Sequence, residues 1–230
     1  MKLKKIIKVA IDSPSAAGAG TISKMLATHY NLFHLDTGKI YRLLARNLMQ
    51  KKPKNKIKYL KKISKKINLK ELKSKSLLSD EVAYVASQIA QDIRIRKLVL
   101  KFQRIHAYNP PDSYMGSVLD GRDICSVVIK NATFKFYITA NLQERSKRRF
   151  LELKKLGKKV KFREILNSMK KRDREDRTRK HSRLKKTSDS YLINTSNLSI
   201  KSSFLKVKKI MDRKLHRYGR SYKTRKKQIA

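Results

Sequence analysis

The fold of this 230-residue chain is decided by ten residues near its start, Asp12-Ser-Pro-Ser-Ala-Ala-Gly-Ala-Gly-Thr21. They follow an apolar run, Ile6 to Ile11, and precede an amphipathic stretch, Ile22 to Tyr30. A strand, a loop of small residues and a helix in this order are typical of a phosphate-binding loop. Backbone amides at the helix N-terminus can face an anion there, and small residues let the backbone approach phosphate oxygens closely. Thr21 adds a hydroxyl that can reach Mg²⁺.

The loop departs from the usual pattern, which is a glycine, four residues, a second glycine and a lysine. Ser13 holds the first glycine position, Gly18 holds the second, and Ala19 stands where the lysine belongs. The loop motif alone is therefore a weak indication, and the rest of the chain has to support it.

Composition limits the class of protein. The chain has 60 Lys and Arg against 17 Asp and Glu, a net charge of +43, and 40% hydrophobic residues, which is enough for a core. Its length suits one domain with an insertion or two small domains. The basic residues occur throughout the chain, which favours solvated lysines on open faces, and nucleic-acid binding is the alternative. Cys125 is the only cysteine, which excludes an internal disulfide and fits a reducing cytoplasm. No segment has the apolar length of a membrane span, and the histidines are scattered without metal-ligand spacing.

Strands alternate with helices along the chain. The expected strands cover residues 6–11, 32–36, 117–120, 132–139 and 191–195, and the main helices cover 22–30, 93–107, 142–156, 162–169 and 200–215. Ser79 is the expected cap of a further helix. The charged stretch from Arg172 to Lys186 has almost no apolar anchors, so we expect a mobile or solvent-facing loop. Alternating strands and helices predict a parallel sheet with both faces covered and ligands at the carboxyl ends of its strands.

Functional groups follow three of these strands: the small-residue loop, Asp36-Thr-Gly38 and Asp120-Gly-Arg-Asp123. A carboxylate at the end of a buried strand, beside a phosphate loop, is well placed to hold Mg²⁺. Arg42 and Arg122 have the forked guanidinium that matches phosphate oxygens, although either alone fits a surface salt bridge equally well. The stretch from Arg172 to Arg179 has four arginines in eight residues, which fits a lid that closes over phosphates or a solvated helix.

Together these motifs resemble the bacterial cytidylate kinase family, in order from about Ile6 to Leu215. The stretches that carry the resemblance are residues 10–21, Leu35-Asp-Thr-Gly-Lys-Ile-Tyr-Arg42, Val85-Ala-Ser-Gln88, Arg94-Ile-Arg96, Asp120-Gly-Arg-Asp123, Glu144-Arg145 with Arg148-Arg149, and Arg172 to Arg179. The resemblance implies a P-loop NTPase-type three-layer α/β/α fold with a parallel sheet, a nucleoside-monophosphate-binding insertion and a lid. We assign residues 1–48 and 93–215 to the core, 49–92 to the insertion, about 157–186 to the lid, and 216–230 to a basic tail without fixed structure.

The resemblance also implies transfer of the ATP γ-phosphate to CMP or dCMP with Mg²⁺. It implies that the base is recognised by Ser87, Arg96 and Asp123, the acceptor phosphate by Arg42 and Arg122, and the ribose by Arg172 and Asp176. Arg179 is implied at the transferring phosphoryl group, Asp120 and Thr21 at the metal, and Thr37 and Tyr41 at the substrate. ATP is implied to bind Ser13, Pro14, Ser15, Ala16, Ala17, Gly18, Ala19, Gly20, Thr21 and Arg149. The expected catalytic set is Arg122, Arg172, Arg179, Asp120 and Lys39.

Three departures from the family pattern carry expectations of their own. Because Ala19 replaces the lysine, we hypothesise that Lys39 supplies an ammonium group from the adjacent strand end; the alternative is an ordinary surface lysine. The insertion lacks the hairpin expected between Asn68 and Ser79. Arg183 stands where the family lid has proline, so the lid hinge is expected to differ.

The sequence therefore predicts a cytoplasmic, monomeric CMP kinase that uses ATP and Mg²⁺. Two alternatives stay open: a catalytically weakened P-loop protein that binds RNA, in which the basic tail could take part, and a kinase for another monophosphate such as UMP.

Overall fold

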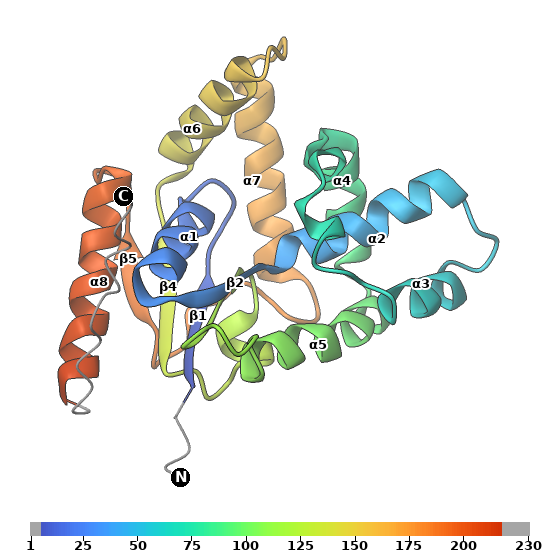
Figure 1. The fold of residues 1–230 in the computed structure, drawn as a ribbon. Helices are drawn as coiled ribbons and strands as arrows, with labels where there is room; N and C mark the ends of the chain where they lie inside the picture. The colour runs from blue at the N-terminus through green and yellow to red at the C-terminus, as the bar shows by residue number, and fades with distance from the viewer. Residues whose placement is uncertain (1–5, 218–230) are drawn as a thin grey trace, which may run out of the picture.

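A single parallel sheet determines where the functional residues lie. The computed structural model describes residues 6–217. Its strands are β1 (Ile7–Asp12), β2 (Leu32–Asp36), β3 (Gly116–Gly121), β4 (Phe134–Thr139) and β5 (Tyr191–Asn194). They pair in the order β2-β3-β1-β4-β5, and every pairing is parallel (Figure 1). This confirms the predicted sheet and puts the carboxyl ends of the strands on one edge.

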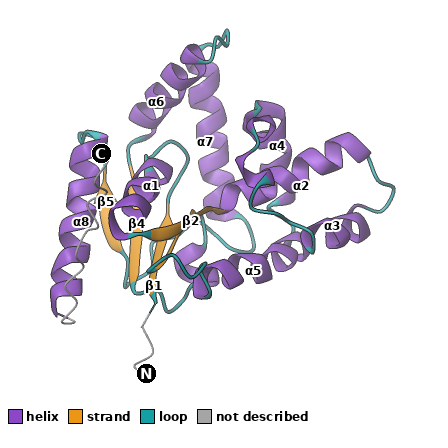
Figure 2. Cartoon of the chain, viewed as in Figure 1, coloured by secondary structure: helices purple, strands orange, loops and turns teal. Residues whose placement is uncertain are grey.

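Helices cover both faces of the sheet (Figure 2). They are α1 (Ala19–Tyr30), α2 (Thr37–Lys51), α3 (Lys56–Ser64), α4 (Asp80–Ile89), α5 (Ile93–Tyr108), α6 (Leu142–Lys155), α7 (Phe162–Thr178) and α8 (Ile200–Arg217). On one face, α1 and α8 pack against apolar side chains of β1, β3 and β4. On the other, α2 and α5 pack against side chains of β1, β2 and β3. The predicted three-layer arrangement is confirmed.

The central strand β1 has apolar residues at successive positions because both of its faces are covered. Val9 and Ile11 belong to the core beneath α1 and α8, and Ala10, between them, belongs to the core on the other face. All three side chains are fully buried. A strand covered on both sides needs apolar residues at every position, which the run before the phosphate loop provides.

The segment predicted as the insertion, residues 49–92, contains the end of α2, α3, two short 3₁₀ turns at Glu71–Lys73 and Lys75–Leu78, and α4. The two turns occupy the segment where the sequence lacks the family's hairpin. Leu60, Leu72 and Leu77 are buried and attach the insertion to the core of α2 and α5. The Ser79 hydroxyl accepts a hydrogen bond from the Val82 amide at 3.2 Å, which confirms the predicted cap of α4.

One prediction about the charged segment is wrong. Residues 172–178 are not a loop, because α7 continues through them as far as Thr178. Asp173 is only 8% exposed and Leu184 only 3%, so the segment also has anchors in the interior. The helix continues because its acidic side chains pair with arginines from distant segments, which sequence composition does not reveal.

The predicted basic tail lies almost wholly outside the described residues, which end at Arg217 in α8. Within residues 6–217, the helices are all too short or too polar to cross a bilayer.

Candidate active site

The acidic residues that end the strands lie together at one edge of the sheet. Asp36 pairs in register with Asp120, and Asp12 pairs with Gly121. The Asp12 carboxylate is fully buried and accepts hydrogen bonds from the amides of Ile124 and Cys125 at 2.7 and 2.9 Å. Burial raises the pKa of Asp12 to about 6, against the effect of these two amides. Asp12 thereby fastens the turn after β3, which carries Arg122 and Asp123, to the central strand.

Gly121 lets this turn pass close to α2. A Cβ at position 121 would lie 2.5 Å from the Thr37 hydroxyl oxygen, so only glycine fits without a shift. The same hydroxyl donates a hydrogen bond to the backbone carbonyl of Asp120 at 2.8 Å. The start of α2 and the end of β3 are therefore held in contact.

The phosphate loop is held by contacts to its backbone. Gly18 has φ +88°, a left-handed conformation that favours glycine, and it is the N-cap of α1. The Thr195 hydroxyl donates to the Ala17 carbonyl at 3.0 Å, and Arg145 donates to the Ser15 carbonyl at 3.2 Å. The small-residue loop is thus fixed from β5 and α6, although it has no lysine of its own.

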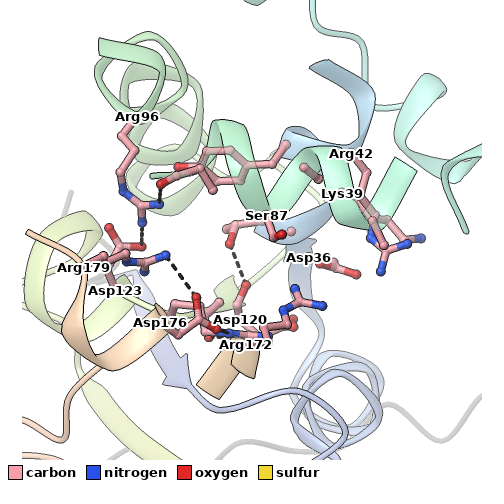
Figure 3. Close-up of a pocket in the computed structure, with 18 of the residues that line it drawn as sticks. Asp36, Lys39, Arg42, Ser87, Arg96, Asp120, Asp123, Arg172, Asp176 and Arg179 are labelled. Atoms are coloured by element: carbon pink, nitrogen blue, oxygen red, sulfur yellow. Dashed lines mark hydrogen bonds and ion pairs between the residues drawn. The ribbon is translucent and has the colours of Figure 1, made fainter. Parts of the chain in front are cut away.

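Two cavities meet at this edge. The inner cavity, of about 220 Å³, is lined from α2, α4, α5, α7 and the turn after β3 (Figure 3). The loop cavity, of about 680 Å³, contains all of residues 13–21 in its wall, and its volume is typical of a small-molecule site. The two cavities share a wall made of Asp36, Arg42, Ala83, Ser87, Asp120, Arg122 and Arg172.

A buried ion pair lies at one end of the inner cavity. Arg96 contacts the Asp123 carboxylate at 2.7 Å, with side chains only 7% and 8% exposed, and also donates to the Ala90 carbonyl at 2.9 Å. Its guanidinium lies over the Tyr41 ring at 5.3 Å. Figure 3 shows Arg96 and Asp123 pointing toward one another, with Ser87 across the cavity. This group presents both a donor and an acceptor to a planar polar ligand.

A cluster of arginines surrounds Asp176. Arg122 contacts one carboxylate oxygen of Asp176 at 2.8 Å, and Arg179 contacts the other at 3.1 Å. Burial alone raises the pKa of Asp176, but the positive charges of Arg122, Arg172 and Arg179 lower it below its usual value. Arg42 joins this region from α2 and donates to the Leu77 carbonyl at 2.8 Å. Such a concentration of guanidinium groups at a shared wall suits a ligand with several phosphates.

The carboxylates beside the loop fit a magnesium ion. His34 contacts one oxygen of Asp120 at 2.6 Å, and the other oxygen faces Gly20, 3.8 Å from where a Cβ would stand. Burial and the charge of Asp120 raise the pKa of Asp36, because two neighbouring acids disfavour each other's ionised forms. Magnesium is usually held by one or two carboxylates together with substrate phosphates. Asp120 and Asp36, with the hydroxyl of Thr21, are the oxygen donors that fit it here.

The lid is fastened to the phosphate loop. Arg145 of α6, which contacts the loop at Ser15, forms a two-pronged pair with Asp173 of α7, and its side chain is 3% exposed. A second set of contacts joins α6, and the segment that follows it, to the start of α4. Arg149 and Lys158 contact the two oxygens of Asp80 at 2.8 and 2.5 Å. The lid and the insertion are therefore bridged across the loop cavity.

All predicted site residues line one or both cavities. The loop cavity takes residues 13–21 and Arg149; the inner cavity takes Thr37, Lys39, Tyr41, Arg96, Asp123, Asp176 and Arg179; and Arg42, Ser87, Asp120, Arg122 and Arg172 line both. The individual roles stay predictions. Lys39 lines the inner cavity only, so its position gives no support to the hypothesis that it serves the phosphate loop.

Sequence reasoning assigned no role to His34, Arg145, Asp173 or Asp80. His34 lies 86 residues before its partner Asp120, and Arg145 lies 28 residues before Asp173. Pairs so far apart leave no local pattern. Arg145 and Asp173 did stand in stretches that carry the family resemblance, which was the available indication.

Comparison with known proteins agrees with this geometry. The family model described as cytidylate kinase matches residues 9–213. A cytidylate kinase of Bartonella tribocorum is 44% identical over 201 residues, which cover 85% of this chain and 90% of that protein. A cytidylate kinase of Mesorhizobium japonicum is 35% identical over 217 residues, which cover 94% and 99%. The solved structure of an uncharacterized protein from Eubacterium ventriosum has the same fold, with a TM-score of 0.52 at 17% identity over 90% of this chain and 99% of that one.

The match spans the sheet, the phosphate loop, the insertion and the lid, all of which contribute side chains to the two cavities. The chain therefore belongs to the cytidylate kinase family.

Proposed function

We propose that this protein transfers the γ-phosphate of ATP to CMP and dCMP, giving ADP and CDP or dCDP. The observation that carries the proposal is the shared wall of the two cavities. The phosphate loop lines one cavity, the Arg96–Asp123 pair lines the other, and Arg42, Arg122 and Arg172 lie between them. Relatives named cytidylate kinase, with 35–44% identity over most of the chain, support the same substrate.

The base would bind in the inner cavity. The Asp123 carboxylate accepts a hydrogen bond from the exocyclic amine of cytosine, and Arg96 donates to the ring nitrogen and carbonyl. Uracil would present a carbonyl oxygen to Asp123 and leave a buried charge without a donor, so CMP is favoured over UMP. Ser87 lies across the same cavity. Arg172 and Asp176 are expected near the ribose, with Thr37 and Tyr41 on the remaining wall.

The reaction needs positioning and charge stabilisation rather than a covalent intermediate. A phosphate oxygen of CMP, held by Arg42 and Arg122, attacks the γ-phosphorus in line, and the bond to the β-phosphate oxygen breaks, leaving ADP. Arg179 and Arg122 stabilise the charge that develops on the transferred group. Magnesium, when bound at Asp120, Asp36 and Thr21, neutralises charge on the β- and γ-phosphates. The lid, held by the Arg145–Asp173 pair, keeps water out of the cavity.

A coupled assay that detects ADP, run with CMP, dCMP, UMP and AMP in turn, tests this proposal. We expect turnover with CMP and dCMP and at least tenfold lower kcat/KM with UMP and AMP. A preference for UMP or AMP indicates a kinase for another monophosphate. No ADP with any acceptor, together with tight RNA binding that weakens steeply with salt, indicates the RNA-binding alternative.

A further inference from the structure

The phosphate loop of this chain lacks a cation at the position where P-loop enzymes place one. Ala19 is the first residue of α1 and is only 5% exposed, so its methyl group lies where a lysine stem would begin. The usual lysine reaches the β- and γ-phosphates and balances their charge. The loop here offers backbone amides and hydroxyl groups but no cation, so another residue has to bring the positive charge.

The basic side chains of the loop cavity are the candidates, and most are already engaged. They are Lys24, Arg42, Arg122, Arg149, Lys171 and Arg172. Arg149 pairs with Asp80 and Glu152, Arg122 with Asp176, and Arg42 donates to a backbone carbonyl. Lys24 and Lys171 are exposed, where an ammonium is well solvated. Arg172 differs from the other arginines because neither an ion pair nor a backbone carbonyl engages it among residues 6–217, and from the two lysines because it is less exposed.

Arg172 is a half-buried arginine with no ion-pair partner in the described part of the chain. Within residues 6–217 its Nε is fully buried and has no hydrogen-bond partner. The nearby acid Asp176 accepts from Arg122 at one carboxylate oxygen and from Arg179 at the other, and no ion pair joins it to Arg172. The next residue, Asp173, pairs with Arg145 instead. Burial, followed by the charge of Arg122, lowers the pKa of Arg172 to about 10, against the attraction of Asp176. A half-buried guanidinium whose Nε lacks a hydrogen-bond partner is therefore available to an incoming anion.

The position of Arg172 is suited to the transferred phosphate. It lines both cavities, so it belongs to the wall across which the phosphoryl group must pass. Figure 3 shows it beside Asp120 and Asp176, below the base-binding residues. The helix that carries it is held by the Asp173–Arg145 pair, and Arg145 also contacts the loop at Ser15. The guanidinium is therefore held near the loop by a connected set of contacts.

We propose that Arg172 takes the place of the missing loop lysine and binds the terminal phosphates of the donor nucleotide. The inference rests on the proposed function and deepens it, because it names the cation that serves ATP in this chain. It replaces Lys39 in that role and gives Arg172 a donor-side contact in place of the expected ribose contact. A planar guanidinium can bind two phosphate oxygens at once, which one ammonium cannot.

Equilibrium binding distinguishes a contact of Arg172 with ATP from a contact with the ribose of CMP, and it needs no turnover. ATP and CMP are titrated separately into the parent protein and into Arg172→Gln, which removes the charge but keeps a polar side chain. We expect the Kd of ATP to rise by at least about tenfold and the Kd of CMP to change by less than threefold. Lys170→Gln, two residues earlier, exposed and outside both cavities, is the matched control and should change neither Kd more than threefold. A loss confined to CMP, equal losses for both ligands, or no loss overturns the proposal.

A double-mutant cycle tests the replacement itself. Arg172→Gln is made in the parent and in Ala19→Lys, and kcat is measured with ATP and CMP. We expect the loss caused by Arg172→Gln to be at least tenfold smaller when Lys occupies position 19, and an equal loss in both backgrounds contradicts the replacement. If Ala19→Lys does not fold, the binding experiment decides alone. If the parent protein binds ATP but does not phosphorylate CMP, the proposed function is wrong. The Kd of ATP for the parent and for Arg172→Gln then decides the role of Arg172.

Discussion

Replacing Asp123 with asparagine should change which pyrimidine the protein prefers. The Asp123 carboxylate is 8% exposed and contacts Arg96 at 2.7 Å. In Asp123→Asn the amide oxygen can still accept from Arg96, and the amide nitrogen then faces the base. Cytosine presents its amine to this nitrogen, so a donor meets a donor, whereas uracil presents a carbonyl that can accept.

The magnitude follows from the hydrogen bond that is lost. A hydrogen bond to a charged group contributes about 1.5–3 kcal/mol. At about 1.4 kcal/mol per tenfold, kcat/KM for CMP should fall by roughly 10- to 150-fold. The ratio of kcat/KM for UMP to that for CMP should rise by at least the same factor. Because Arg96 loses its buried countercharge, the free energy of unfolding should also fall by about 1–3 kcal/mol.

The assay measures ADP formation with CMP and with UMP, at a temperature where both proteins are fully folded. Asp92→Asn is the control. Asp92 caps α5, the helix that carries Arg96, and pairs with the exposed Arg94, and asparagine caps a helix equally well. It should leave the ratio of the two substrates unchanged. If Asp123→Asn lowers the rate for CMP and UMP by the same factor, Asp123 does not face the base and the assignment is wrong.

Four further predictions concern the shared wall, the lid and the sheet. Arg122→Ala should lower kcat by at least about 10³-fold with an unchanged circular dichroism spectrum, since its guanidinium serves the transferred phosphate; activity within a few-fold of the parent refutes that role. Arg145→Ala leaves a buried carboxylate on α7 unpaired, so urea unfolding should show a loss of about 3–5 kcal/mol, and a loss below about 1 kcal/mol would contradict the observed pairing. Burial raises the pKa of Asp176, but the neighbouring arginines have the larger effect and lower the pKa below the ordinary aspartate value of about 3.9, so the ionised form stabilises the fold above that pH. The difference in unfolding free energy between the parent and Asp176→Asn should be full at pH 5–7 and should shrink below about pH 4. A difference that grows below about pH 4 contradicts this sign. Gly116→Ala puts a Cβ 2.0 Å from the Ile7 carbonyl oxygen, whereas Gly157→Ala meets nothing within 4 Å, so calorimetry should show the first to be less stable by at least about 2 kcal/mol despite the positive φ of Gly157.

The parts of the fold that local patterns specify were predictable from sequence. β1 is a continuous apolar run because it is covered on both faces, and the small residues after it mark the turn into α1. Asp36 and Asp120 each end a strand, and parallel pairing then brings them to one edge in register. These inferences need only strand periodicity and the geometry of a parallel sheet.

The lid shows where local patterns fail. The sequence from Arg172 onward has alternating charges and few apolar residues, which favours an exposed loop. In the structure α7 continues because Asp173 and Asp176 pair with Arg145 and Arg122. The helix is stabilised by partners 28 and 54 residues away, so its length is set by tertiary contacts and not by local composition.

The sequence alone also could not identify the residue that we propose in place of the loop lysine. Lys39 is the conspicuous cation in the sequence, because it follows a strand end next to the loop. Its side chain lines the inner cavity, however, while Arg172 lines both cavities and lacks a counterion among residues 6–217. Only the packing of α7 against the loop distinguishes the two.

Direct transfer of phosphate between the two cavities is the central claim, and single-turnover transfer from γ-labelled ATP measures it. With the parent protein in excess over ATP and with CMP present, we expect the label to appear in CDP, in equal amount to the ADP formed. Release of the label as inorganic phosphate, or its retention in ATP after long incubation, would contradict a shared site for donor and acceptor.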